Sequence, residues 1–449
     1  MNRDNIDFGK ERISSLFRRI LIPTLLGMLC MSVMTIIDGA FVGHGAGSDA
    51  LAAINIFCPL WLIVTGFGLM YGIGCSVVAS IHLSHENTKA ANINITQTLL
   101  FGSVVSLLLT IVVNIFDVEI ARLLGASDQL LPLVLDYQKW LSLAFVPIFL
   151  ETVGLLIIRM DGSPRYAMWC SSLPSIINVI LDYVFLYVLD WGLEGVAIAT
   201  ATGCLTGGLM VIVYMLWMTK RIALYRLKRS LKSLRLMIRN IGYQTKLGVA
   251  ALFGDISIAI FLLVGNHVFM HYLSEDGVAA FSIVCYVMPF IFMTGNAIAQ
   301  SGQPIISYNY GADKLHRVNQ ARLLIIRTAL AVGVVTLLIG MLCSEYITGI
   351  FLEREYASYQ MAVAGLPIVA LGFIPYIYNV TMIGYLQSIE RAKSATLFSA
   401  LRSVIFIVPA FILMPKAVEG IGIWLALPVS ESLTMILLYS FVEHSGNRQ

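Results

Sequence analysis

The chain has 449 residues, of which 58% are hydrophobic and only 12% are charged, and its formal net charge is +3. A soluble domain carries about 25% charged residues, so this composition predicts a protein that crosses a membrane many times. A net charge this small gives no support for a nucleic-acid partner, and we expect none. The seven cysteines are odd in number and lie in or beside apolar segments, so we expect neither disulfides nor a cysteine metal site.

Twelve segments are apolar over the roughly 20 residues that a helix needs to cross a bilayer core. In chain order they lie at roughly 16–42, 51–77, 93–115, 132–157, 164–188, 193–218, 246–271, 279–304, 321–343, 361–387, 395–415 and 421–442. The first follows a basic start, as a signal peptide does, but it is too long and lacks a cleavage pattern, so we expect it to be retained. The predicted fold is an all-α membrane protein with twelve transmembrane helices.

The positively charged residues predict the orientation of these spans. With the N-terminus in the cytoplasm, the cytoplasmic loops and helix ends hold 25 of the 29 Lys and Arg residues. The other side holds four, which are Arg122, Lys139, Arg354 and Lys416. We therefore expect a multi-pass protein of the inner (plasma) membrane with both termini in the cytoplasm. The long basic stretch at 220–246 is expected to lie on anionic lipid headgroups.

The chain also repeats itself. LAAINI at 51–56 matches VAAFSI at 278–283 at an offset of 227, and LEGVAIA at 193–199 matches VEGIGIW at 418–424 at an offset of 225. Because six spans separate the two copies, the pattern predicts two six-helix bundles with the same orientation, related by an internal parallel repeat. We assign an N-terminal lobe to 1–219, a cytoplasmic linker to 220–245 and a C-terminal lobe to 246–449. Such repeats are typical of alternating-access carriers.

Charged groups inside the predicted spans are functional candidates, because each costs roughly 2.5–3.5 kcal/mol at mid-membrane. In SIINVILDYVFLYV (175–188), Asn178 and Asp182 are four residues apart and share one helix face. At 1.5 Å per residue, Asp38 and Thr200 lie about as deep as Asp182, roughly 6–11 Å below the outer surface. We therefore predict that these four residues surround one small volume.

The predicted chemistry of this group is that of a cation site. Two carboxylates, an amide oxygen and a hydroxyl are hard oxygen ligands that suit Na⁺ or a proton, and two close carboxylates cannot both ionise cheaply. The alternative is that Asp38 and Asp182 only join separate helices. The repeat favours an ion site. At the repeat offset, Asp38 aligns with Gly265 and Asp182 aligns with Ile407 to Pro409, so the second lobe lacks the acidic pair. A pair that only joined helices would be expected in both lobes.

Other polar residues in the spans are weaker candidates for contact with substrate or for a second site. They are Asp255 in span seven, Gln300 in span eight and Glu431 in the middle of span twelve. A purely structural role stays open for each of them. Glu151, in span four, is better interpreted as a polar contact near the inner vestibule.

Over its whole length the chain resembles the multidrug and toxic compound extrusion (MATE) family. The resemblance depends on DGAFVGH (38–44), GSPRYAM (162–168) and GQPIISYNYGA (302–312). In the bacterial and archaeal branch that it resembles most, it implies a cation site at Asp38, Asn178, Asp182 and Thr200, and a bend of helix one at Pro23. Helix ten offers Gln387 but no acid, so the second-lobe site of the Na⁺-linked branch is incomplete here.

We expect a monomeric H⁺- or Na⁺-coupled antiporter that exports small organic, often cationic and amphipathic compounds, with no cofactor besides the coupling ion. The alternative is a flippase for lipid-linked oligosaccharide or another lipid. A flippase is expected to have a cationic cavity for a diphosphate headgroup, whereas the basic residues near the spans here are placed at cytoplasmic helix ends. A drug or sugar facilitator of the other large superfamily is disfavoured, because HLSHENTKAAN (82–92) does not match G-x-x-x-D-[RK]. No HExxH or GxSxG pattern supports an enzyme.

Overall fold

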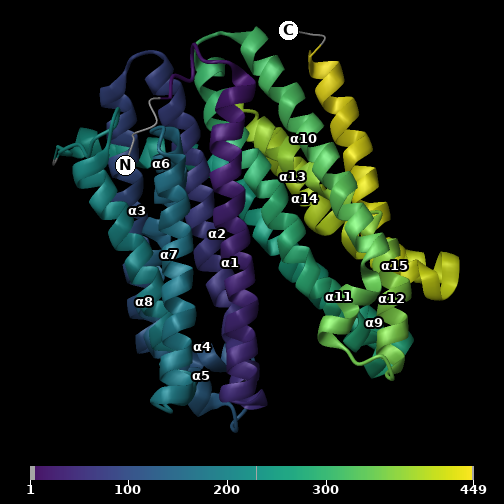
Figure 1. Cartoon of the computed structure of the whole chain (residues 1–449). Coiled ribbons are helices and arrows are strands. Elements are labelled where there is room, and N and C mark those ends of the chain that lie inside the picture. The colour runs from purple at the N-terminus through teal and green to yellow at the C-terminus, as the bar shows by residue number, and fades with distance from the viewer. Residues whose placement is uncertain (1–5, 229, 447–449) are drawn as a thin grey trace. The chain divides into compact units, whose positions relative to one another are not determined.

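The computed structural model describes residues 6–228 and 230–446, and all regular elements in these two ranges are helices. The first are α1 (Ile13–Gly45), α2 (Ser48–Ser84), α3 (Thr88–Ile115), α4 (Asp117–Leu123), α5 (Leu131–Leu143), α6 (Phe145–Met160), α7 (Pro164–Tyr183), η1 (Val184–Val188), α8 (Gly192–Val213) and η2 (Tyr214–Met218). The others are α9 (Leu231–Gly311), α10 (Leu315–Leu342), α11 (Ser344–Phe351), α12 (Ala357–Ala370), α13 (Phe373–Ser388), α14 (Ala392–Ala400), η3 (Leu401–Phe406) and α15 (Ile407–Gly446). The η elements are π-helical, and Figure 1 follows the chain through the series.

The helices account for the predicted membrane spans. Within the described ranges, nine helices are long and apolar enough to cross a membrane, and two bent pairs, α5–α6 (48°) and α12–α13 (46°), each form one more span. The 81-residue α9 contains two spans, because its backbone leaves the helical conformation at Ser274 (φ 58°, ψ −156°). Counted in this way, the helices match the twelve predicted segments, and the protein is a multi-pass membrane protein.

The internal repeat is visible in the backbone. The left-handed turn at Gly47 (φ 86°) recurs 227 residues later at Ser274 (φ 58°), and the one at Glu86 (φ 59°) recurs at Asp313 (φ 55°). The two bent spans also correspond, because they are the fourth span of each half and bend by nearly the same angle. The two halves therefore share turns and bends as well as hydropathy.

The described part of the chain divides into two compact units. Unit 1 contains the residues up to Leu252 together with Ser307–Leu315, and unit 2 contains Phe253–Ile306 together with the residues from His316 onward. The change from one unit to the other thus falls inside α9. The linker at 220–245 and the lobe boundary at 246 stay predictions, since they are defined by sequence and membrane side rather than by packing.

Polar contacts explain why the first part of α9 packs in unit 1. The Gln244 side chain is buried, its amide nitrogen donates to Asn94 Oδ1 (3.1 Å), and its Oε1 accepts from Thr98 Oγ1 (2.5 Å). One turn earlier, Asn240 Nδ2 donates to Gln97 Oε1 (2.9 Å) on the same face of α3. A buried amide is costly unless it is hydrogen-bonded, so these bonds fix the register of α9 against α3.

Candidate functional site

The two acidic residues predicted to pair do meet in unit 1. Asp38 of α1 and Asp182 of α7 bring their carboxyl groups within hydrogen-bonding reach of each other, and the two helices pack extensively. Asp182 is completely buried, whereas Asp38 is half-buried. Among the described residues, no other donor reaches either oxygen of Asp182 or Oδ1 of Asp38.

This geometry restricts the charge of the pair. Two carboxylates in contact within a low-dielectric interior cannot both ionise without a large repulsion. Either one proton is shared between Asp38 and Asp182, or a bound cation neutralises both. The pair can therefore take up and release a positive charge, which is the chemical requirement for coupling to an ion.

The other two predicted site residues form a second pair beside the first. Asn178 lies one turn before Asp182 on α7, and its amide nitrogen donates to Thr200 Oγ1 of α8 at 3.3 Å. Both side chains are half-buried. The structure thus gives two polar pairs that are joined through consecutive turns of α7. A single ion site made by all four residues stays a prediction.

Tyr137 belongs to this region, and the sequence analysis missed it. It lies on α5, it is buried, and its phenol group interacts electrostatically with both Asp38 and Asp182. Its ring packs edge-on against Phe57 (centroids 5.6 Å apart), so the hydroxyl is held in place. A phenol can donate to a carboxylate or accept from a carboxylic acid, which suits it to either charge state of the pair.

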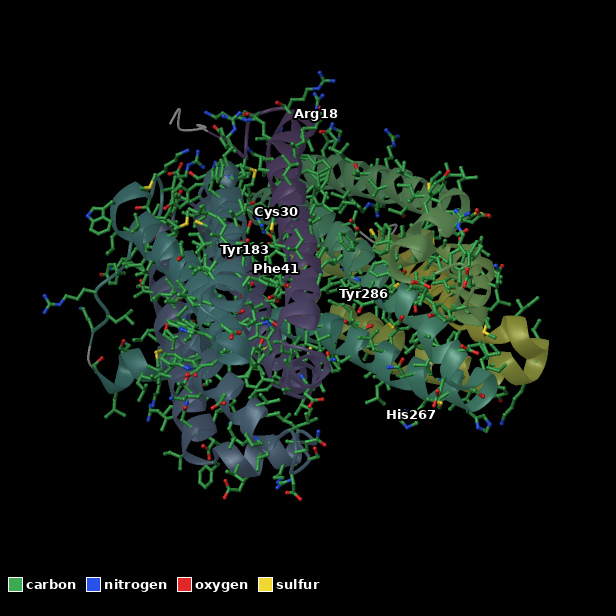
Figure 2. All side chains as sticks on the ribbon, turned by 60° about the horizontal axis from the view of Figure 1, so that its bottom comes forward. Arg18, Cys30, Phe41, Tyr183, His267 and Tyr286 are labelled. Carbon is green, nitrogen blue, oxygen red and sulfur yellow. The ribbon has the colours of Figure 1, made fainter. Side chains whose placement is uncertain are left out.

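Aromatic rings cover the end of the helices just beyond the acidic pair. Phe41 of α1 lies beside Tyr183 and Tyr187 of α7 and η1 (centroids 6.2 and 5.8 Å apart), and Tyr187 donates to the Phe41 backbone carbonyl at 3.3 Å. Figure 2 labels Phe41 and Tyr183 on their neighbouring helices. The π-helical η1 follows Asp182 almost directly, and π-helical turns are frequent at functional sites.

Comparison with known proteins adds to this geometry. A family model described as MatE matches the chain twice, at residues 23–184 and at residues 250–412. The chain belongs to the MatE family. The two matches begin 227 residues apart, which agrees with the predicted repeat. MATE proteins are transporters, so the expectation that this chain is not an enzyme is confirmed.

Relatives cover nearly the whole MATE chain. Multidrug export protein MepA of Staphylococcus saprophyticus subsp. saprophyticus is 24% identical over 435 residues, with 95% of this chain and 94% of that protein covered. The fold is similar to an outward-facing conformation of a multidrug resistance MATE family transporter, with TM-score 0.90, 18% identity and coverage of 99% and 98%. It is also similar to a MATE structure in the straight conformation, with TM-score 0.88, 19% identity and coverage of 97% and 96%.

The acidic pair has no counterpart in the second half of this MATE chain, as predicted from the repeat. Gly265, which corresponds to Asp38, lies directly under Phe281, and a Cβ placed there would come within 2.3 Å of the ring. Phe281 packs in turn against Phe261, Phe269 and Phe411, with centroids 5.4, 4.5 and 6.4 Å away. An aromatic core therefore fills the equivalent space in unit 2 and leaves no room for a carboxylate.

The secondary candidates lie in different surroundings. Asp255 is half-buried on α9, and its charge acts on Tyr376 of α13. Gln300 is buried on α9. Glu431 is buried on α15 and bound to Arg402, so it has a full set of strong contacts rather than an open face. Their roles in binding substrate or ion stay predictions.

Arg402 is not at a cytoplasmic helix end, where the sequence analysis places it. Its side chain is only 2% exposed, and it lies in the π-helical η3 between α14 and α15. The sequence analysis placed Arg402 near the start of the apolar segment at 395–415. The helix begins earlier, at Ala392, and α14 and η3 pack against α13 and α15, so Arg402 lies inside the helix bundle. One argument against a lipid flippase, that the basic residues near the spans lie at cytoplasmic helix ends, is therefore wrong for Arg402.

Pro23 lies where a bend in helix one was predicted. It is buried inside α1, which is helical from Ile13 to Gly45. Proline has no N–H group, so the backbone carbonyl one turn earlier receives no helical hydrogen bond. The helix is weakened at this point in the conformation described here, and a role for Pro23 as a hinge stays a prediction.

Proposed function

We propose that this MATE transporter is an H⁺- or Na⁺-coupled antiporter that exports small organic, often cationic and amphipathic compounds. The observation that carries the proposal is the contact between Asp38 and Asp182, which is buried, has no other donor among the described residues, and is absent from the second half of the chain. The name of the relative MepA, a multidrug export protein, supports the substrate class. We place the transporter in the plasma membrane as a monomer with both termini in the cytoplasm.

The proposed coupling follows from the charge of the pair. From the outside, an ion neutralises Asp38 and Asp182 and lowers the repulsion between α1 and α7, so the two helices pack more tightly. A ligand shifts a conformational equilibrium only by its differential affinity for the two states, so the ion must bind more tightly to the outward-facing state that has released the drug. A tenfold difference in ion affinity corresponds to about 1.4 kcal/mol of coupling.

A flippase remains the second candidate, because the buried Arg402 could serve a phosphate-bearing lipid. However, Arg402 Nε already forms an ion pair with Glu431 at 2.7 Å, so the positive charge is compensated inside the chain and is a poor match for a diphosphate. Among the described residues, no second arginine or lysine forms an ion pair with Glu431. The antiporter is therefore the better proposal.

The test is dye export from proteoliposomes in which a pH gradient and a Na⁺ gradient are imposed separately. We expect one gradient to drive export by the wild type, and Asp182→Asn to lower that export by about tenfold or more. The matched control is Asp190→Asn, because Asp190 is an exposed residue in the turn after η1. Full gradient-driven export by Asp182→Asn, at equal protein content, would disprove the mechanism.

A further inference from the structure

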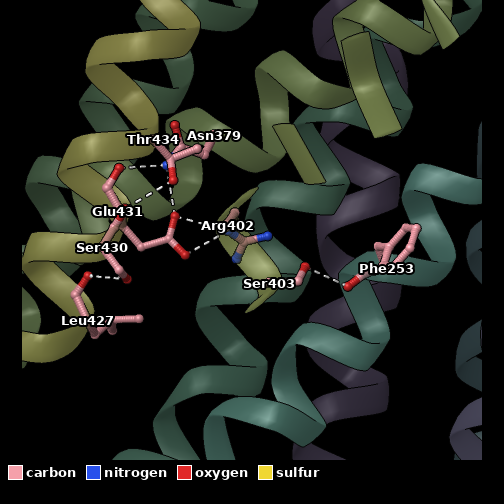
Figure 3. Close-up of polar contacts among 8 residues, drawn as sticks. All are labelled: Phe253, Asn379, Arg402, Ser403, Leu427, Ser430, Glu431 and Thr434. Carbon is pink, nitrogen blue, oxygen red and sulfur yellow. Dashed lines mark hydrogen bonds and ion pairs between the residues drawn. The ribbon is translucent and has the colours of Figure 1, made fainter. Parts of the chain in front are cut away.

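The second half of the chain contains a charged cluster that the acidic pair does not explain. Arg402 Nε donates to both carboxylate oxygens of Glu431, at 2.7 and 3.0 Å, and Asn379 Nδ2 donates to Glu431 Oε2 and to its backbone carbonyl, both at 2.8 Å (Figure 3). The guanidinium also lies over the ring of Tyr376, 3.9 Å from its centroid. Three elements, α13, η3 and α15, thus converge on one carboxylate.

This cluster is deeply buried. Arg402 and Glu431 are each 2% exposed, and Asn379 is fully buried. A buried ion pair is a weak source of stability, because the cost of removing two charges from water offsets most of their attraction. Charged residues inside a membrane span are therefore rare, and a function other than stability is the default interpretation.

The repeat relates the cluster to the acidic pair. Arg402 lies in span eleven and Glu431 in span twelve, which are the repeat equivalents of span five, with Asn178 and Asp182, and span six, with Thr200. At the offset of 227, Arg402 falls on Ser175 and Glu431 falls on Cys204, so neither charge occurs in the first half. Each half therefore carries its own polar group on the same pair of helices, and only the first leaves its carboxylates without an internal cation.

The atoms around the guanidinium are those of a site for a hard cation. Glu431 supplies a carboxylate, and Asn379 Oδ1 is a buried amide oxygen that has no hydrogen-bond partner among the described residues. Carboxylate and amide oxygens are preferred ligands of alkali and other hard cations, and an aromatic face such as that of Tyr376 also attracts a positive charge. The positive group that lies among them is the chain's own arginine.

We propose that Arg402 is a tethered cation that permanently occupies a monovalent-cation site formed by Glu431, Asn379 and Tyr376. This inference rests on the proposed ion-coupled function, and it adds that this cluster exchanges no free ion, so that Glu431 does not bind the driving ion that the Asp38–Asp182 pair takes up. A guanidinium attached to η3 cannot dissociate into solution as a free ion does, and arginine does not deprotonate in proteins. Glu431 therefore stays neutralised in every state of the cycle.

Removing the arginine should open the site to a free ion. The test compares purified Arg402→Ser with Arg402→Ser/Glu431→Gln, which share an intact Asp38–Asp182 pair. Apparent melting temperatures are measured in detergent with chlorides of Na⁺, K⁺ and choline at equal ionic strength. We expect Na⁺ or K⁺, but not choline, to raise the melting temperature of Arg402→Ser by about 4 °C or more, and to leave the double variant at its choline value.

The remaining outcomes are decisive as well. A response of Arg402→Ser to pH alone, with no difference among the three chlorides, would overturn the proposal, because Glu431 then takes a proton and the site does not fit a metal ion. If Arg402→Ser is recovered only when Na⁺ or K⁺ is present during extraction, the proposal is supported. If it is recovered in none of the chlorides, while the double variant folds, the proposal is overturned, because an ion that fits would restore the fold.

The result does not depend on the proposed function. Both variants retain Asp38 and Asp182, so an ion that binds there affects them equally and cancels in the comparison. Arg402→Lys provides a further control, because it keeps a tethered positive charge, and we expect it to show no difference between Na⁺ and choline beyond that of the wild type. Loss of gradient-driven export in Asp182→Asn tests the coupling mechanism separately.

Discussion

Asp38 and Asp182 behave as one chemical unit in this structure. Their carboxyl groups meet, and no other donor in the described ranges reaches the oxygens of Asp182. Two groups that share one proton or one cation lose their joint function when either group is neutralised. Asn178 and Thr200, in contrast, have each other as hydrogen-bond partners, so their removal leaves the acidic pair in contact.

We therefore predict strong non-additivity between Asp38→Asn and Asp182→Asn. Each single substitution should lower gradient-driven dye export by about tenfold or more. The double variant should export dye as fast as the less active of the two single variants. The measurement is initial export rate in proteoliposomes at equal protein content. If the effect of the double variant equals the product of the two single effects, the carboxylates act at independent sites and this interpretation is wrong.

The sequence could predict some of these residues but not others. The four-residue spacing of Asn178 and Asp182 places both on one face of a helix, and the depth of Asp38 and Thr200 in their spans predicted the other two residues. Tyr137 is one of 19 tyrosines and follows no pattern, so only the structure, in which its phenol group interacts electrostatically with both acids, reveals it. Arg402 was misplaced because a hydropathy count cannot detect a π-helical turn or the partner on α15.

Close approach of backbones decides how the helices of unit 1 fit together. Gly248 of α9 lies against the backbone of Met70 of α2, and a Cβ added at Gly248 would come within 1.8 Å of the Met70 carbonyl oxygen. The carbonyl belongs to a helix and cannot move as a side chain does. Hydropathy predicts that α2 and α9 are helices, but only this contact and the amide bonds to α3 show that α9 begins in unit 1.

We predict that Gly248→Ala destabilises the protein by about 1–3 kcal/mol, because the new methyl group overpacks a rigid contact. Gly242, six residues earlier on the same helix, is the matched control, because a Cβ there meets no atom within 4 Å. Gly242→Ala should be neutral or slightly stabilising, since alanine is the better helix former. Apparent melting temperatures of the purified variants provide the measurement, and equal values for the two would contradict the role assigned to the contact.

On the scale of the whole chain, the repeat duplicates the scaffold but not the chemistry. The turns and the bent fourth spans recur, and the same family model matches both halves. The charged groups differ, because the Asp38–Asp182 pair occurs in the first half, whereas the second holds the Arg402–Glu431 ion pair and an aromatic core at the position of Asp38. The hydropathy pattern predicts the helices that the two halves share. The difference between the halves depends on individual side chains, which an average over a window of residues does not detect.

The loops of unit 1 also separate into two faces. On one face Arg221 Nη2 donates to the Ile6 carbonyl (3.1 Å), Lys314 Nζ donates to the Gly9 carbonyl (3.0 Å), and the backbone N–H of Ala223 donates to an Asn92 side chain (2.9 Å). The N-terminal segment, the start of α3, the basic stretch after η2 and the end of α9 therefore lie on the same side of the membrane. These segments are rich in basic residues, so the positive-inside rule predicts that this side is cytoplasmic.

This arrangement predicts the labelling of single cysteines placed at the two faces. Ser127, in the loop between α4 and α5, and Lys228, in the stretch after η2, are both exposed. In a variant that lacks the seven native cysteines, we expect Ser127→Cys to react with a membrane-impermeant maleimide in intact cells, because its loop faces outward. Lys228→Cys should react only after the cells are permeabilised, and both should react fully in detergent, which controls for accessibility. The opposite pattern would reverse the orientation, place the acidic pair nearer the cytoplasm, and so require the driving ion to enter the pair from the inside.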